Sequence, residues 1–315
     1  MNTKKTVLVT GAAGFIGRHC LPYLMEKGYE VHAVSITPVK SVFSNIHWHQ
    51  VDLMDSTQTD ELFARVQPTH LLHCAWCVVG KNWASHENFE WTQASFALIK
   101  SFVKHGGKRA TIAGSCAEYD WDFGYCSESL TPLSPRTVYG ACKQSLYILM
   151  NAFAEQNELS LAWGRIFFLY GPHQNPASLI PYVIQSLIKG ETAKCSHGNQ
   201  IRDFLHVEDV ASAFISLLDS QVTGPINIAS GNPIKLKEVI YKISDKFRSP
   251  DLIKLGALPS GVIDSPIIVA DTNNLKEKLG WKPKYEIDEG LDRTIEWWKA
   301  QKVSKLSNNK SLMSG

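Results

Sequence analysis

Short apolar runs alternate with amphipathic stretches through the first half of the chain. Strands are predicted where β-branched and apolar residues cluster, and helices where apolar residues recur at helical spacing. Strands and helices that alternate in this way are typical of βαβ units. The pattern therefore predicts an α/β fold, a doubly wound parallel sheet covered by helices on both faces. The predicted strands cover residues 6–10, 30–35, 47–51, 70–74, 109–113 and 161–167, and the predicted helices cover 15–27, 60–66, 89–105 and 135–155.

The pattern is less regular after residue 171, where Pro and Gly interrupt the apolar runs. We interpret residues 1–170 as one domain and residues 171–300 as mainly a smaller, interleaved one. Segments at about 204–230 and 262–272 are expected to pack onto the first domain, and the polar stretch 302–315 is expected to be a flexible tail. Helices are predicted here at 179–189, 204–218, 236–246 and 287–299.

Composition narrows the class of protein. Hydrophobic residues make up 44% of the chain and charged residues 20%, as in a folded globular protein. The 32 basic and 30 acidic residues give a net charge of +2, so neither nucleic acid nor a membrane is an expected partner. The seven cysteines have no regular spacing and are predicted to be free thiols. With no signal-peptide pattern and no long apolar run, the cytoplasm is the expected location.

A glycine-rich turn lies between the first predicted strand and the first predicted helix, at residues 11–17. Glycine permits a tight turn there, and the helix N-terminus offers N–H groups to a pyrophosphate. Together with Thr10 the stretch reads TGAAGFIG and resembles the extended short-chain dehydrogenase/reductase family, also described as the NAD-dependent epimerase/dehydratase family. The resemblance covers nearly the whole chain. It implies a Rossmann-type sheet with a smaller C-terminal substrate domain, and a nucleotide-sugar epimerase, dehydratase or ketoreductase.

Tyr139 and Lys143 lie one helical turn apart, so their side chains share one helix face. A cation beside a phenol favours the phenolate, and lowering the phenol pKa by about 3 units requires roughly 4 kcal/mol. Tyr23 and Lys27 have the same spacing, so the spacing alone does not identify the pair. The resemblance implies that Tyr139 and Lys143 are catalytic, with Ser115 as the hydroxyl that orients the substrate oxygen.

The residues after Ser115 separate reaction types within the family. Its sugar 4,6-dehydratases carry an Asp–Glu pair where this chain has Cys116 and Ala117. Neither of these can supply the acid and the base that dehydration requires. Glu118 is one position late and is expected to point elsewhere. Dehydratase activity is therefore disfavoured.

Ser35 stands at the tip of the second strand, where NAD-binding relatives usually carry an acidic residue. A serine leaves room for a 2′-phosphate, and Arg18 and Lys40 are candidates to pair with it. We therefore expect NADP(H) as the preferred cofactor, with NAD(H) as the alternative. The resemblance implies further cofactor contacts at Gly11, Ala13, Gly14, Phe15, Ile16, Gly17, Asp52, Leu53, Cys74, Ala75, Tyr139 and Lys143.

Arg202 lies in a stretch, GNQIRDFLHVEDV, that resembles a nucleotide-sugar-binding motif of the family. The resemblance implies that its guanidinium contacts the sugar-nucleotide diphosphate; a structural Arg–Asp pair is the alternative. Other candidates to contact substrate are Cys116 and Ala117 and residues on loops at the carboxyl edge of the sheet. These loop residues are Trp76, Trp83, Tyr119, Asp120 and Trp121.

Two histidine pairs, His47/His49 and His70/His73, lack a third ligand in the sequence. We interpret them as structural and expect no metal.

The leading hypothesis is an NAD(P)H-dependent reductase of a nucleotide-activated 4-keto-6-deoxysugar, in which Tyr139 gives the proton. The alternative is a nucleotide-sugar 4-epimerase with tightly bound NAD. A 4,6-dehydratase and a non-catalytic NADP-binding protein are weaker alternatives. The resemblance also implies a homodimer formed through the helices predicted at 89–105 and 135–155.

Overall fold

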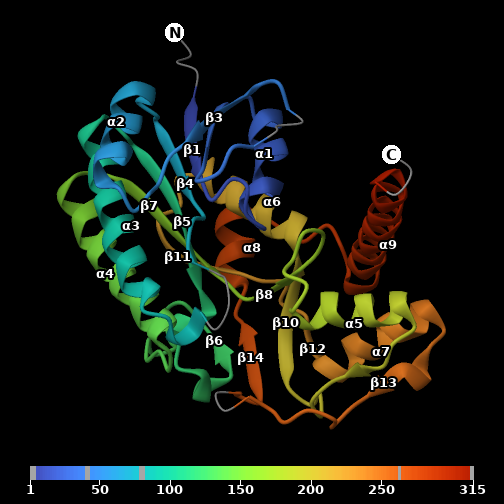
Figure 1. The fold of residues 1–315 in the computed structure, drawn as a ribbon. Coiled ribbons are helices and arrows are strands. Elements are labelled where there is room, and N and C mark those ends of the chain that lie inside the picture. Colours follow the sequence, from blue (N-terminus) through green and yellow to red (C-terminus); the bar gives the residue numbers. More distant parts are fainter. Residues whose placement is uncertain (1–4, 40–42, 78–81, 262–263, 313–315) are drawn as a thin grey trace.

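The computed structural model describes residues 5–39, 43–77, 82–261 and 264–312. Its centre is a seven-stranded sheet, and every neighbouring pair of strands in it is parallel (Figure 1). The spatial order is β11-β7-β5-β4-β1-β2-β3. The strands span β1 Thr6–Thr10, β2 Glu30–Ser35, β3 Ile46–Gln50, β4 His70–His73, β5 Arg109–Ser115, β7 Ser160–Ile166 and β11 Gly224–Ile228.

Helices cover both faces of this sheet, so the predicted doubly wound α/β fold is confirmed (Figure 1). Alternate residues of each strand face opposite layers: Val7 and Val9 pack under α1 and α6, whereas Leu8 packs under α2, α3 and α4. The helices span α1 Gly17–Glu26, α2 Ser56–Val66, α3 Glu87–Lys104, α4 Val138–Gln156 and α6 Val207–Leu218.

A second, smaller unit contains a mixed sheet in the order β12-β10-β14-β6, with β8 paired to β10. Helices α5, α7 and α9 enclose its apolar core. Its strands span β6 Tyr125–Cys126, β8 Phe168–Tyr170, β10 Ile201–His206, β12 Pro233–Lys235 and β14 Ile267–Ala270, with a separate pair β9 Ala193–Lys194 and β13 Ile253–Lys254. Its helices span α5 Leu179–Lys189, α7 Leu236–Phe247 and α9 Ile287–Leu312, whereas α8 Asn273–Leu279 packs against β11 of the first sheet. Short 3-10 turns occur in both units, at η1 Asn82–Ala84, η2 Cys116–Glu118, η3 Trp121–Phe123 and η4 Pro250–Leu252.

The second unit differs from the sequence prediction in three places. Residues 204–206, predicted as helix, pair with 168–170 as part of β10, and α6 begins only after the N-cap His206. Strand β14, expected against the first domain, lies between β10 and β6 in the second sheet. The predicted tail continues α9 to Leu312, because no Gly or Pro ends the helix after Lys299.

The two units exchange strands. Strands β6 and β8 come from the first 170 residues but complete the second sheet, while β11 returns to pair with β7 in the first. The chain therefore crosses between the units several times, and the segment 204–230, expected to return to the first unit, includes α6 and β11. Among the described helices, none is both long and apolar enough to span a membrane.

Candidate active site

The turn after β1 has a backbone that requires glycine. Gly11 has a φ of +64°, and a Cβ there would lie 2.7 Å from the backbone nitrogen of Ala75. A Cβ on Gly17 would lie 2.2 Å from the Gly11 carbonyl oxygen. The turn therefore packs directly against the end of β4 and the start of α1, and a larger residue at either position would displace it.

A buried hydrogen-bond chain holds the same turn to its neighbours. Thr10 Oγ1 lies 2.7 Å from His73 Nδ1, and His73 Nε2 lies 2.9 Å from Ser95 Oγ on α3. Burial lowers the pKa of His73 to about 3, so the imidazole is neutral. His73 is thus a structural residue, as the sequence predicts.

A cavity of about 590 Å³ opens at the carboxyl ends of β1, β2 and β4, beside α3. Ligands of open α/β sheets bind at this edge. The cavity brings together much of the predicted cofactor set, namely Gly11, Ala13, Gly14, Ser35, Asp52, Leu53 and Ala75, with Trp76.

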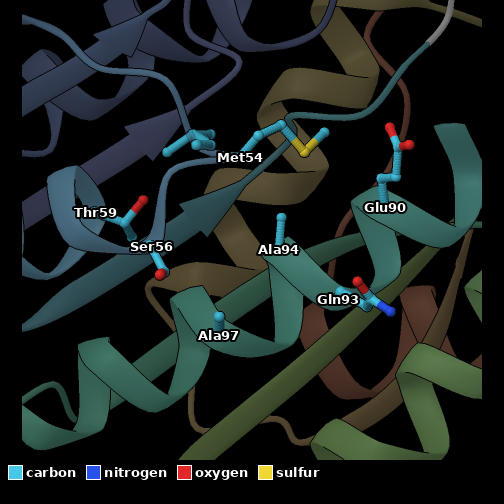
Figure 2. A pocket seen from close by; sticks show the side chains of 8 residues that line it. Met54, Ser56, Thr59, Glu90, Gln93, Ala94 and Ala97 are labelled. Carbon is cyan, nitrogen blue, oxygen red and sulfur yellow. The ribbon is translucent and has the colours of Figure 1, made fainter.

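A second cavity of about 390 Å³ continues from the first, between the start of α2 and α3 (Figure 2). Leu53, Met54 and Glu90 line both cavities. Figure 2 shows Ala94 and Ala97 on the α3 surface, where their short side chains leave this space open. Helix α3 contributes Glu87 and Glu90 to the first cavity and Gln93 and Ala94 to the second. Glu87, Glu90 and Ala94 have the spacing of one helix face.

Ser115 and Tyr139 are brought together by the packing of α4 against η2. The side chain of Thr137 caps α4 by accepting a hydrogen bond from the Gly140 N–H. Gly140 permits the close approach, since a Cβ there would lie 2.2 Å from the Ala117 carbonyl oxygen. The Ser115 hydroxyl then lies close enough to the Tyr139 hydroxyl to lower its pKa, against the larger effect of burial.

Lys143 lies one turn further along α4 and is buried. Its Nζ donates to the Ala113 carbonyl at 2.8 Å and lies 3.7 Å from the centre of the Trp76 ring. Burial lowers the pKa of Lys143 to about 7, and burial also raises the pKa of Tyr139 above its ordinary value. The expected lowering of the phenol pKa by a full ammonium charge is therefore wrong for this structure. The same burial that places Lys143 beside the site removes part of its charge.

We expect Lys143 to make stability depend on pH. Unfolding returns its pKa from about 7 to about 10.5, so between pH 7 and pH 10 the unfolded chain binds a proton that the folded chain does not. The free energy of unfolding then rises with pH in this window, by up to about 1.4 kcal/mol per pH unit from this group. Urea unfolding of Lys143→Met should lack that rise. Lys27→Met is the matched control, because Lys27 is exposed and pairs with Asp219; parallel pH profiles for wild type and Lys143→Met would contradict the assignment.

Glu118 is fully buried, and its carboxylate contacts Trp163 and Arg165. Its carboxylate accepts hydrogen bonds from the Ser115 N–H at 2.7 Å, the Trp163 indole and Arg165 Nε at 2.7 Å. It is therefore held in an ion pair and fixes the Ser115 backbone, a role that sequence analysis missed. Cys116 and Ala117 are also buried, and burial raises the pKa of the Cys116 thiol.

Two predicted cofactor residues point away from the cavity. Arg18 donates to the Ala13 and Gly14 carbonyls and hydrogen-bonds His173, and it lines a different cavity beside α1. The side chain of Cys74 packs against the core under α1 that contains Cys20. Arg18 is thus not brought beside Ser35, and the other candidate, Lys40, lies outside the described residues.

Arg202 forms the Arg–Asp pair that the sequence left open. Its Nη2 lies 2.6 Å from Asp264 Oδ1, and its guanidinium lies over the Phe168 ring. The partner is Asp264 and not the adjacent Asp203, whose carboxylate accepts from Ser230 and Gly231.

The aromatic candidates divide into two groups. Tyr119 and Trp121 are buried, with Tyr119 bonded to Asn227 and the Trp121 indole donating to the Cys116 carbonyl. Trp76 and Trp83 instead lie edge-on to the Tyr139 ring, with ring centres 6.3 and 5.9 Å away. These two indoles frame the Tyr139 side of the site.

Comparisons with known proteins agree with this geometry. The family model described as "NAD dependent epimerase/dehydratase family" matches residues 7–229. CDP-abequose synthase of Salmonella typhimurium is 26% identical over 93% of this chain and 98% of its own length. A UDP-N-acetylglucosamine 4-epimerase from Methanobrevibacter ruminantium superposes with a TM-score of 0.86 at 25% identity, over 95% of this chain and 99% of its own. A Thermus thermophilus UDP-glucose 4-epimerase in complex with NAD gives a TM-score of 0.85 at 23% identity, over 93% and 99% of the two chains, which shows the shared fold.

Proposed function

The chain belongs to the NAD dependent epimerase/dehydratase family, and we propose that it reduces a nucleotide-activated 4-keto-6-deoxysugar with a nicotinamide cofactor. This proposal rests on the proximity of the Ser115 and Tyr139 hydroxyls. The neighbouring carboxylate of Glu118 is held in an ion pair by Arg165. Carbonyl reduction requires one hydride and one proton, and Ser115 and Tyr139 together are sufficient to deliver the proton. Dehydration requires an additional acid and base, where this chain has Cys116 and Ala117.

The residues of the cavity fit a dinucleotide. Gly11 and Gly17 leave the backbone exposed where a Cβ would clash, and the first turn of α1 has neither a side-chain cap nor an acidic residue. Such a helix N-terminus attracts a pyrophosphate. When bound, the reduced nicotinamide supplies the hydride.

The chain's own residues would handle the oxygen of the substrate. Ser115 holds the carbonyl oxygen, and Tyr139 donates a proton to it as the alkoxide develops. Because burial raises the pKa of Tyr139, the phenol carries its proton at neutral pH, which suits a proton donor. Lys143 holds α4 to β5 through the Ala113 carbonyl, and its contact with the cofactor ribose is part of this proposal.

The second candidate is a nucleotide-sugar 4-epimerase. It is favoured by the similarity to a UDP-N-acetylglucosamine 4-epimerase over nearly the whole chain. Epimerisation begins by oxidising an alcohol, so Tyr139 would first have to accept a proton. The similarity to CDP-abequose synthase supports reduction instead.

The test is an activity assay in which the protein is supplied with NADPH or NADH and with CDP-, dTDP-, GDP- or UDP-linked 4-keto-6-deoxyhexoses in turn. Loss of the near-ultraviolet absorbance of reduced nicotinamide, with formation of the 4-hydroxy sugar by NMR, is the expected result. Interconversion of 4-epimeric sugars without net cofactor oxidation, together with co-purified NAD, would establish the epimerase. No turnover in either assay would contradict both.

NADP(H) is the cofactor we propose as preferred, and the preference rests on Ser35, which lines the cavity without a charge. A carboxylate at this position would repel a 2′-phosphate by roughly 3 kcal/mol at about 5 Å. We therefore expect Ser35→Asp to lower kcat/KM for NADPH by about 100-fold and to lower that for NADH far less. Ser35→Asn has nearly the same shape without the charge and should keep the wild-type preference. A wild-type enzyme that uses NADH better than NADPH would contradict this part of the proposal.

The homodimer also remains a prediction. Helices α3 and α4 lie side by side on one flank of the molecule (Figure 1). Ile148 and Leu149 are exposed on α4, which supports this flank as the contact between two copies.

A further inference from the structure

Four polar side chains gather on one face of β2 and β3, far along the strands from Ser35. They are Glu30 and His32 on β2 and His47 and His49 on β3, here called the histidine cluster. His32 lies directly opposite His47 in the parallel register. Glu30 lies two residues before His32 and His49 lies two residues after His47, so the two-residue period of a strand places all four on the same face.

The distances within the cluster are close to those of a metal site. Glu30 Oε1 lies 3.8 Å from His32 Nε2 and 3.8 Å from His47 Nε2. One ligand atom from each of these three residues lies within 4.8 Å of the others. Tetrahedral zinc, with bonds of about 2.0–2.1 Å, separates its ligand atoms by about 3.4 Å. Small side-chain rotations therefore bring the three atoms to binding distance.

We propose that Glu30, His32 and His47 bind a zinc ion through one carboxylate oxygen and two imidazole Nε2 atoms. Two histidines and a carboxylate form a ligand set that zinc accepts. His47 is 58% exposed, so a fourth position faces solvent and can hold water. The histidine pair in the sequence lacked a third ligand; the pairing of β2 with β3 supplies Glu30 and His32.

His49 has a different role in the cluster. Its Nε2 lies 2.8 Å from His32 Nδ1. When His32 Nδ1–H donates to His49, the Nε2 of His32 is left unprotonated and directed at Glu30, as a zinc ligand requires. Such outer hydrogen bonds fix the tautomer and orientation of metal-binding histidines. His49 is thus a positioning residue and not a ligand.

A zinc ion bound here would also stabilise the edge strand β3. Strand β3 ends the seven-stranded sheet and pairs only with β2 in it. An ion between Glu30 and His32 on one strand and His47 on the other would tie β3 to the sheet. The protein supplies three ligands and one of them, His47, is well exposed, so we expect micromolar affinity and not tighter.

The experiment is a zinc titration of the full-length chain against a chromophoric chelator. One ion should bind with micromolar affinity. His32→Ala, His47→Ala and Glu30→Gln should each weaken binding by about 100-fold, and His49→Ala by about 10-fold. His86→Ala is the matched control, since His86 is an exposed histidine without a side-chain cap bond, and it should bind zinc as wild type does.

Two further measurements distinguish zinc binding at the histidine cluster from zinc binding by cysteines and from misfolding of a variant. The cobalt-substituted chain should show four-coordinate absorption without a thiolate-to-cobalt charge-transfer band. Zinc should raise the thermal unfolding midpoint of wild type and of His86→Ala but not of His47→Ala, with all three giving the same far-ultraviolet circular dichroism. Absence of saturable zinc binding, a thiolate band, or undiminished affinity in His47→Ala would each overturn the proposal.

Discussion

Replacing Tyr139 with Phe is expected to lower kcat for reduction of the keto sugar by about 1,000-fold, within the range for loss of a general acid. The substitution removes the hydroxyl that pairs with Ser115 and leaves the ring between Trp76 and Trp83. Cofactor binding should be nearly unchanged, because the cavity around Gly11 and Ser35 does not depend on that hydroxyl. Steady-state rates and a fluorescence titration of NADPH measure the two quantities separately.

The chain offers a matched control for this variant. Tyr23 and Lys27 repeat the same spacing on α1, where burial raises the pKa of Tyr23 to about 12 and Lys27 pairs with Asp219. Tyr23→Phe removes a phenol of the same sequence pattern without touching the site, and its kcat should equal that of wild type. Near-wild-type kcat in Tyr139→Phe would show that the proton comes from another group.

The second large effect is expected on stability. Glu118→Gln should lower the free energy of unfolding by about 3–5 kcal/mol, because it leaves the charge of Arg165 buried without its partner. It should also lower kcat, since the Glu118 carboxylate accepts from the N–H of Ser115. Urea unfolding monitored by tryptophan fluorescence measures the first effect, and Trp163 contacts the same carboxylate.

An exposed ion pair provides the comparison for that variant. Asp288→Asn breaks the contact of Asp288 with Lys242 at the surface and should cost less than about 1 kcal/mol. A double variant with Glu118→Gln and Arg165→Met should be more stable than Glu118→Gln alone, since the unpaired charge is then removed. If Glu118→Gln unfolds at the wild-type urea concentration, the ion pair does not hold the end of β5.

Local patterns predicted much of the fold and part of the site. The alternation of apolar residues located the seven parallel strands apart from β11, and the glycines at positions 11 and 17 located the turn that lines the cavity. The spacing of Tyr139 and Lys143 placed both on one face of α4, whereas only the family resemblance implied Ser115 as their neighbour. Each of these features depends on residues close together in the sequence or on the fixed geometry of one element.

What the sequence did not predict depends on distant pairing and burial. The apolar pattern of residues 204–206 is compatible with a helix, and only their pairing with residues 168–170 identifies them as a strand. The direction of the Arg18 side chain depends on the carbonyls of the glycine turn and on His173, from another part of the chain. The pKa of Lys143 depends on how deeply α4 packs it beside Trp76, which residue spacing does not specify.

The exchange of strands between the two sheets has a mechanical consequence. A cut near residue 171 would remove β11 from the nucleotide-binding half and leave β6 and β8 without the sheet that they complete. Each fragment would then leave backbone N–H and C=O groups unpaired at an interrupted sheet, so we expect each fragment to be insoluble by itself. We expect the intact chain to unfold in a single cooperative step. Any movement of the two units relative to each other would accordingly be shared among several chain crossings and not confined to one hinge.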